Sequence, residues 1–179
     1  MLIAGSRLIM RWLAHARVGL LALFLIGAAS VPGAQALEWG MIDPGRSTMD
    51  EVRQHYGEPT STSTEKEESY TTTRWVYEGD KAPSGMTRMV VHFGLLGPEG
   101  YRPQVVRGLL LHPKPGAFTR AVVLQGWGMP TAAGAQSGAP AYMYEEGLFV
   151  SFDPEGWEVS SMMFTPRQKM PPVEAEPAR

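Results

Sequence analysis

The chain has 179 residues, no cysteine and a formal net charge of −2. The absence of cysteine excludes disulfides, metal sites with thiolate ligands, a cysteine nucleophile and a lipid attached through cysteine. The acidic balance, with 16 Lys and Arg against 18 Asp and Glu and no run of basic residues, argues against binding to nucleic acid or to anionic lipid headgroups.

Residues 1–36 have the pattern of a secretory signal peptide, whether translation starts at Met1 or at Met10. Arginines precede an apolar run that ends in the small residues Ala34 and Ala36. The run is about a dozen residues long, whereas a membrane-spanning helix needs ~20. We therefore expect cleavage after Ala36, a soluble periplasmic protein, no membrane span after cleavage and no lipid anchor.

The segment 48–57 has the pattern of a short helix. Thr48 and Glu51 have the spacing of a capping box, and apolar or aromatic residues follow on one side of the helix. Gly57 can adopt the left-handed conformation that ends a helix, and Pro59 prevents the helix from resuming. The segment 61–69 is polar, and we expect it to be a mobile loop.

The helix pattern returns at 114–131, where "KPGAFTRAVVLQGWGMPT" aligns without a gap to "DPGRSTMDEVRQHYGEPT" at 43–60. Identical residues occupy corresponding positions, namely Pro44/Pro115, Gly45/Gly116, Thr48/Thr119, Val52/Val123, Gln54/Gln125, Gly57/Gly128, Pro59/Pro130 and Thr60/Thr131. The second copy lacks the glutamate of the capping box, so its cap should be weaker. The alignment predicts an internal duplication.

Strand patterns follow each helix stop. They are rich in β-branched and aromatic residues and lie at 71–78, 87–93 and 104–112 in the first copy and at 141–146, 148–152 and 158–164 in the second. "DPEG" at 153–156 suits a type I turn. Val91 and Phe93 should face the helices and His92 the other way, because side chains alternate along a strand.

These elements predict an α+β fold of two tandem repeats. Each repeat would be a short helix followed by a three-stranded antiparallel meander, with the helices packed on one face of a joined sheet. The expected boundaries are 37–113 for the first repeat and 114–166 for the second. The proline-rich, charged end, 167–179, is expected to be a disordered tail.

The motif residues resemble the SmpA/OmlA, or BamE-like, domain family of the bacterial envelope. The residues that carry the resemblance are Gly45, Thr48, Glu51, Val52, Tyr56, Gly57, Pro59, Thr60, Trp75, Tyr77, Gly128, Pro130, Thr131, Tyr144, Glu145, Gly147 and the run 150–159. The resemblance implies a non-enzymatic module that binds another envelope protein, with a role in outer-membrane assembly. The same small fold is also similar to the repeats of β-lactamase inhibitory proteins, which implies a soluble enzyme inhibitor as the alternative.

Catalytic patterns are weak in this sequence. His55, His92 and His112 are far apart and lack the spacing of a metal site, although His92 and His112 could meet across neighbouring strands. No Gly-x-Ser-x-Gly elbow and no glycine-rich phosphate loop occurs. We therefore expect no enzymatic activity, no cofactor and no metal, and a monomer that binds an envelope protein.

Aromatic residues are the candidate binding groups. Trp75 and Tyr77 fall on one face of a predicted strand, and Tyr142 and Tyr144 on one face of another. Core packing is the first expectation for large aromatics. If the four instead line an open sheet face, they form an aromatic patch that anchors a partner.

Overall fold

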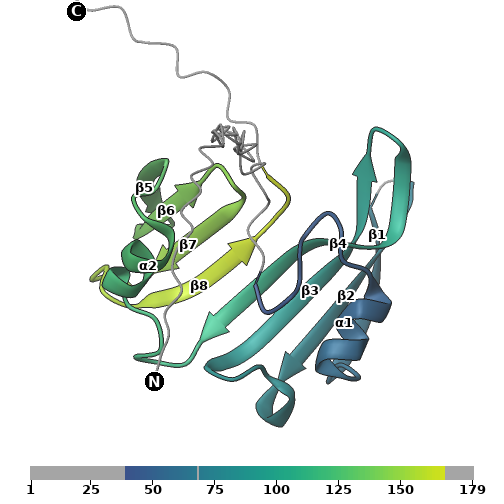
Figure 1. Cartoon of the computed structure of the whole chain (residues 1–179), viewed down its shortest axis with the longest axis horizontal. Coiled ribbons are helices and arrows are strands. Elements are labelled where there is room, and N and C mark those ends of the chain that lie inside the picture. Colours follow the sequence, from purple (N-terminus) through teal and green to yellow (C-terminus); the bar gives the residue numbers. More distant parts are fainter. Residues whose placement is uncertain (1–38, 68, 168–179) are drawn as a thin grey trace, which may run out of the picture. The chain divides into compact units, whose positions relative to one another are not determined.

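The computed structural model of the protein describes residues 39–67 and 69–167 (Figure 1). The predicted signal peptide, 1–36, lies outside the described residues, as does the predicted tail apart from Arg167. The elements in chain order are α1 (Met49–Tyr56), β1 (Ser61–Glu67), β2 (Tyr70–Glu78), the 3₁₀ turn η1 (Gly79–Lys81), β3 (Met86–Gly97), β4 (Gly100–Pro113), α2 (Arg120–Trp127), β5 (Ala132–Gln136), β6 (Ala139–Tyr144), β7 (Leu148–Phe152) and β8 (Val159–Phe164).

The strands form one eight-stranded antiparallel sheet in the order β1-β2-β3-β4-β8-β7-β6-β5. Strands β4 and β8 join its two halves through a short ladder, in which Leu109, Leu110 and Leu111 pair with residues 162–164. The expected fold, two repeats that each contain a three-stranded meander, is therefore wrong. The protein is mostly a single sheet, and two short α-helices accompany it within the described residues.

The sequence patterns missed the two edge strands. β1 reads STSTEKE and β5 reads AAGAQ, and neither alternates between apolar and polar residues. An edge strand with little buried surface needs no such alternation, because backbone pairing to its one neighbour holds it in place. The predicted mobile loop at 61–69 is for this reason mostly strand β1. Strands β3 and β4 are also longer than the predicted strands at 87–93 and 104–112, because they extend into one hairpin.

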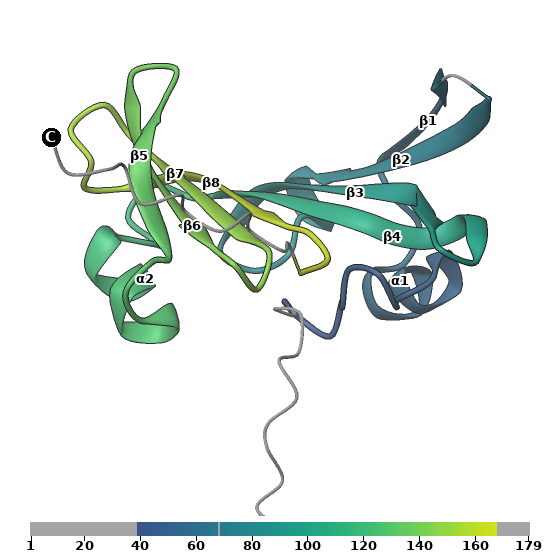
Figure 2. The same cartoon turned by 90° about the horizontal axis from the view of Figure 1, so that it is seen from above.

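Both helices cover the same face of the sheet (Figure 2). Each contributes one fully buried valine, Val52 from α1 and Val123 from α2, to a core that also contains Val91, Phe93 and Phe152. The expected orientation of Val91 and Phe93 toward the helices is thus confirmed. We call the opposite face of the sheet the open face.

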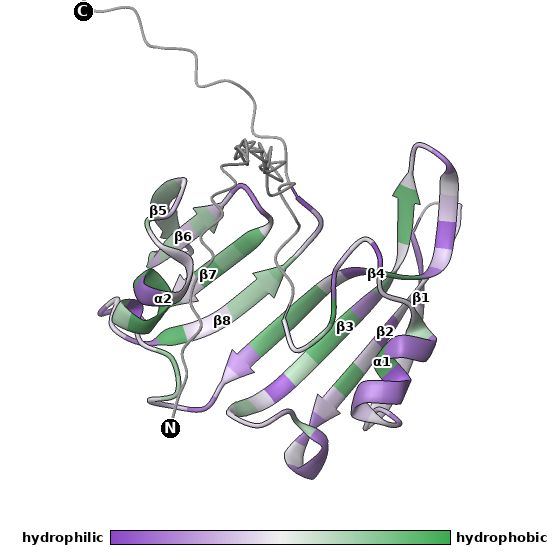
Figure 3. Cartoon of the chain, in the orientation of Figure 1, coloured by the Kyte–Doolittle hydropathy of each residue, from purple (hydrophilic) through white to green (hydrophobic). Residues whose placement is uncertain are grey.

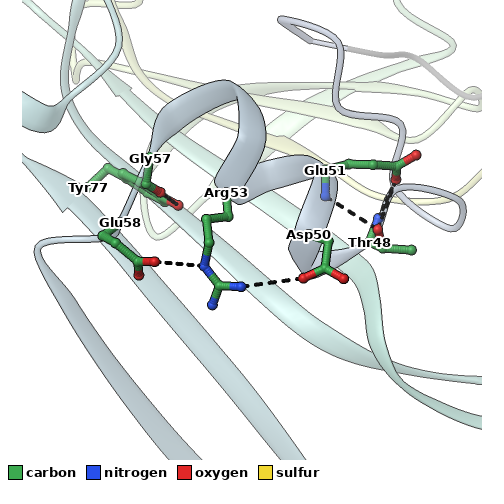
Figure 4. Close-up of polar contacts among 7 residues, drawn as sticks. All are labelled: Thr48, Asp50, Glu51, Arg53, Gly57, Glu58 and Tyr77. Atoms are coloured by element: carbon green, nitrogen blue, oxygen red, sulfur yellow. Dashed lines mark hydrogen bonds and ion pairs between the residues drawn. The ribbon is translucent and has the colours of Figure 1, made fainter.

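Helix capping differs between the two helices in the way that the sequence predicts. In α1 the Thr48 hydroxyl accepts from the Glu51 backbone N–H at 3.4 Å, and the Glu51 carboxylate accepts from the Thr48 backbone N–H at 2.7 Å, a complete capping box (Figure 4). In α2 the Thr119 hydroxyl accepts from the Val122 backbone N–H at 3.3 Å, and valine offers no reciprocal group.

The helix stops have the same backbone geometry in both halves. Gly57 has φ 72° and ψ −160°, and Gly128 has φ 74° and ψ −160°. The positive φ was expected, but ψ lies in the extended region that only glycine occupies readily, not in the left-handed helical region. Each glycine therefore turns the chain directly from the helix into the approach to the next strand.

Candidate functional site

The aromatic residues predicted as a binding patch lie on the helix-covered face, not on the open face. Trp75, Tyr77 and Tyr144 are buried in the core, and Tyr142 is half-buried. The alternation along each strand fixes this outcome, because Trp75 pairs with Val91 and Tyr142 with Val150, both of which are core residues. The binding role expected of these aromatics has no support at three of the four positions, which a partner cannot reach.

Two of these tyrosines brace the helix stops instead. The Tyr77 hydroxyl donates to the Gly57 carbonyl and the Tyr144 hydroxyl to the Gly128 carbonyl, both at 3.1 Å. Burial raises the pKa of Tyr77 to about 12 and also raises the pKa of Tyr144. Both side chains therefore stay protonated and act as donors at any physiological pH.

The half-buried Tyr142 lies under a cation. The Arg120 guanidinium carbon is 5.6 Å from the Tyr142 ring centroid and 5.2 Å from the Phe152 ring centroid. Such a stack shields the ring from solvent and stabilises the cation. Tyr142 thus belongs to the packing of α2 on the sheet.

The prolines and threonines of the repeated motif lie where the chain leaves each helix stop. Pro59 and Pro130 are half-buried just before β1 and β5. The hydroxyl of Thr60 accepts from the Glu78 backbone N–H at 3.1 Å, and that of Thr131 accepts from the Glu145 backbone N–H at 3.0 Å. The sequence did not reveal this second use of the motif, which fastens each helix stop to the end of a strand.

An apolar row crosses the open face from one edge of the sheet toward the other. Cross-strand partners lie on the same face, so the row can be followed through the register. We call it the apolar stripe; its members are Val76, Val90, Leu110, Met163, Phe149, Met143 and Ala132. Val76 and Val90 are buried, whereas Leu110, Met163 and Met143 are half-buried and Phe149 is 37% exposed. The accessible part of the stripe therefore lies over the four neighbouring strands β4, β8, β7 and β6.

A pattern in the sequence indicates the apolar stripe. Most of its members lie in the middle of apolar triplets such as Met89-Val90-Val91, Leu109-Leu110-Leu111 and Leu148-Phe149-Val150. Strict alternation predicts a polar residue on one side of the sheet, whereas a triplet places apolar side chains on both. Such triplets in several neighbouring strands indicate a sheet that is apolar on both faces.

A hollow of about 320 Å³ lies beside the stripe over β5, β6 and β7. Small residues of one cross-strand row, Gly134, Ala141 and Ser151, line it, and Met143 and Phe149 of the stripe lie along its side. We call it the neutral hollow, because its lining residues carry no charge. Two polar side chains of the lining are hydrogen-bonded to each other: the Ser151 hydroxyl donates to the Gln136 side-chain oxygen at 3.2 Å.

The β1–β4 half of the open face is charged. Arg107 donates to both carboxylate oxygens of Glu67 at 2.7 Å, and Arg74 donates to the Ser63 hydroxyl at 3.2 Å. The Arg107 hydrogen bond lowers the pKa of Glu67. Burial, with the charges of Arg107 and Arg74, lowers the pKa of the half-buried His92.

This charged region does not bring the histidines together. His92 pairs with Gly108 and His112 pairs with Arg88, so the row of Val90 and Leu110 separates them. Within residues 39–67 and 69–167, no group of three or more His, Asp or Glu is placed to hold a metal ion. In the same part of the chain, no helix has the length and apolar character needed to cross a bilayer.

Comparison with known proteins adds little to this geometry. Neither a protein-family model nor a curated protein matches the chain. A solved structure of a DUF4309 family protein (YjgB) from Bacillus subtilis subsp. subtilis str. 168 is similar with a TM-score of 0.44 and 11% identity, over 70% of this chain and 82% of that chain.

The resemblance to SmpA/OmlA domains is therefore wrong, because no family model matches the chain. The motif that suggested it is a local device that stops a helix and fastens it to a strand. Its Gly, Pro and Thr follow from backbone geometry and hydrogen bonding.

Proposed function

We propose that this protein is a non-enzymatic protein-binding module and that the open face of its sheet is the binding surface. The accessible part of the apolar stripe carries the proposal. Leu110, Met163, Phe149 and Met143 form a continuous row that the helices leave uncovered. An uncovered apolar row of this kind is typical of a surface that a partner protein covers.

Binding suits the open face better than catalysis because its charged groups are engaged with one another. Arg107 and Glu67 form a two-bond pair, and such pairing leaves neither group free to move a proton or to hold a substrate anion. The pKa of His92 is lowered by burial and, after burial, by the charges of Arg107 and Arg74, which disfavour its protonated form. These contacts support a structural role for the charged region.

The proposal also includes the cellular compartment, the periplasm. The leader pattern of residues 1–36 supports export to the periplasm, so we propose a partner in the cell envelope. A role in outer-membrane assembly depended on the family resemblance and is not retained. An exported enzyme that the protein inhibits remains the second type of partner.

The test compares crosslinking in an envelope extract between the wild type and two matched variants. Phe149→Glu places a charge on the stripe, whereas Gln125→Glu places the same charge on the exposed side of α2. A partner identified by mass spectrometry should be captured by the wild type and by Gln125→Glu and lost with Phe149→Glu, while all three keep a similar melting temperature.

The same partner captured equally by all three proteins would overturn the proposed surface. Turnover of a defined substrate that depends on His92 or Glu67 would overturn the non-enzymatic function. If the captured partner is a hydrolase, a stoichiometric loss of its activity with the wild type and not with Phe149→Glu would identify the protein as an inhibitor.

A further inference from the structure

The two outer edges of the sheet differ in charge. β1 carries Glu65, Lys66 and Glu67, and charges on an edge strand discourage pairing with another chain. β5, the outermost strand at the other end, contains only Ala, Gly and Gln. Moreover, residues 121–144, which include all of α2 except Arg120 and all of β5 and β6, contain no charged side chain. The β5 edge is therefore open to an added strand.

The neutral hollow begins at this same edge. Its lining includes the whole of β5, from Ala132 to Gln136, and extends to Phe149 and Ser151 on β7. A strand added beside β5 continues the cross-strand rows of the open face. Its residue in the row of Gly134 therefore lies next to the entrance of the hollow.

Gly134 leaves that entrance free. Its φ is not positive, and a Cβ built there has no heavy atom within 4 Å. Neither backbone conformation nor packing inside the protein accounts for glycine at this strand position, although glycine weakens a strand relative to alanine. A glycine in a strand often marks a place where another chain approaches closely.

We propose that the β5 edge binds an extended, uncharged segment of the partner protein as an added β-strand, with a bulky apolar side chain of that segment in the neutral hollow. The inference rests on the proposed function and names the part of the partner that the surface recognises. Backbone hydrogen bonds along β5 supply affinity, and the hollow selects the side chain. The Ser151 and Gln136 side chains offer hydrogen bonds to a polar tip, such as a tyrosine hydroxyl.

A second copy of this chain fits the site less well. Two β5 strands paired edge to edge would offer each other only alanine, glycine and glutamine side chains, which leave a hollow of about 320 Å³ unfilled. The segment 168–179 of this chain contains charged residues and prolines, and proline lacks the N–H that a sheet ladder needs. A separate protein with an uncharged extended segment is the better occupant.

The experiment pans a phage-displayed library of random peptides on the protein and then measures labelled synthetic copies of the enriched peptides by fluorescence polarisation. The same substitution at two strand glycines separates the site from the general effect of valine in a strand. Gly134→Val fills the entrance of the hollow, whereas Gly97→Val makes the same change on β3, away from the hollow, at a residue that likewise has no positive φ and no heavy atom within 4 Å of an added Cβ. Valine suits a strand at both positions, so both variants should fold.

We expect enriched peptides with an uncharged stretch and a bulky apolar residue. They should bind Gly134→Val ~10-fold or more weakly and Gly97→Val as well as the wild type. Equal binding to both variants, or no enriched peptide at all, would overturn the inference. If partner capture still depends on Phe149 in that case, the proposed function stands without strand addition. A dimer in sedimentation that Gly134→Val dissolves would replace the partner with a second copy and also overturn the inference.

Discussion

The two halves of the sheet, residues 48–113 and 119–164, each contain one α-helix followed by four strands, but they differ in their surface chemistry. Each half has a threonine-capped helix, a glycine stop with the same dihedral angles and a buried tyrosine that donates to the stop. Only the first half is rich in ion pairs, such as Arg88 with Glu78 and Arg107 with Glu67.

Figure 3 shows the same contrast at the helices, where α1 is largely hydrophilic and α2 is more hydrophobic. The shared features are those that hold the backbone, and the features that differ lie on the surface. We infer that the second half, which is uncharged around β5 and β6, is the half that binds a partner.

The largest expected effect tests the shared helix stops. Gly57→Ala and Gly128→Ala should each lower the free energy of unfolding by ~1–3 kcal/mol, because both residues have positive φ with ψ near −160°. No atom lies within 4 Å of a Cβ at either position, so the cost comes from the backbone alone. Urea unfolding measures it.

Gly126→Ala is the matched control for the helix stops. Gly126 lies in α2, has no positive φ and likewise has nothing within 4 Å of an added Cβ. This variant should stabilise the protein by ~0.5–1 kcal/mol. If Gly57→Ala and Gly128→Ala behave like Gly126→Ala, the two halves do not depend on a glycine-only stop.

A smaller effect is expected at the tyrosines that brace the stops. Tyr77→Phe and Tyr144→Phe remove one hydrogen bond each, from a hydroxyl to the Gly57 or Gly128 carbonyl. Each should cost ~1 kcal/mol of unfolding free energy, measured by denaturant titration, because a carbonyl loses its partner. A loss at one position only would show that the two halves are not fastened in the same way.

The capping difference between the halves can be removed by one substitution. Val122→Glu places a carboxylate at the position in α2 that Glu51 occupies in α1, and Val122 is 42% exposed. A completed capping box should raise the free energy of unfolding by ~0.5–1 kcal/mol. Gln125→Glu adds the same charge near the other end of α2 and should not stabilise, so an equal gain in both variants would rule out capping as the cause.

The smallest expected effect is a pH dependence confined to the first half, because no histidine occurs after His112. The pKa of His92 is lowered in the folded protein, so between that value and the unfolded value of ~6.5 the unfolded chain binds more protons. Stability should fall as the pH drops through this window.

Melting temperatures of the wild type and His92→Gln at pH 7.5 and 5.5 measure this contribution. The wild type should lose more stability than the variant over this interval. The lowered pKa of Glu67 acts only below its usual range near 4.5, so it does not contribute to the comparison. An equal loss in both proteins would remove His92 as the source.

Local signals in the sequence determined the parts of this protein that depend on a few neighbouring residues. Thr48 with Glu51 placed the start of α1, Gly57 and Pro59 placed its end, and the run 153–156 placed a turn in which the Gly156 backbone N–H donates to the Asp153 carbonyl at 2.9 Å. The alternation around Val91 and Phe93 also placed the core face correctly. Each of these follows from steric or hydrogen-bonding requirements within one or two turns of chain.

Only the tertiary structure decided the sheet edges, the seam and the candidate site. β1 and β5 are each held by pairing to one neighbouring strand. The seam between the two halves is the short ladder in which residues 109–111 of β4 pair with residues 162–164 of β8. The neutral hollow brings Gly134 beside Ser151 through the register of β5, β6 and β7. Backbone pairing is nearly independent of side-chain identity, so a sequence can show which residues suit a strand without showing which strand will lie beside it.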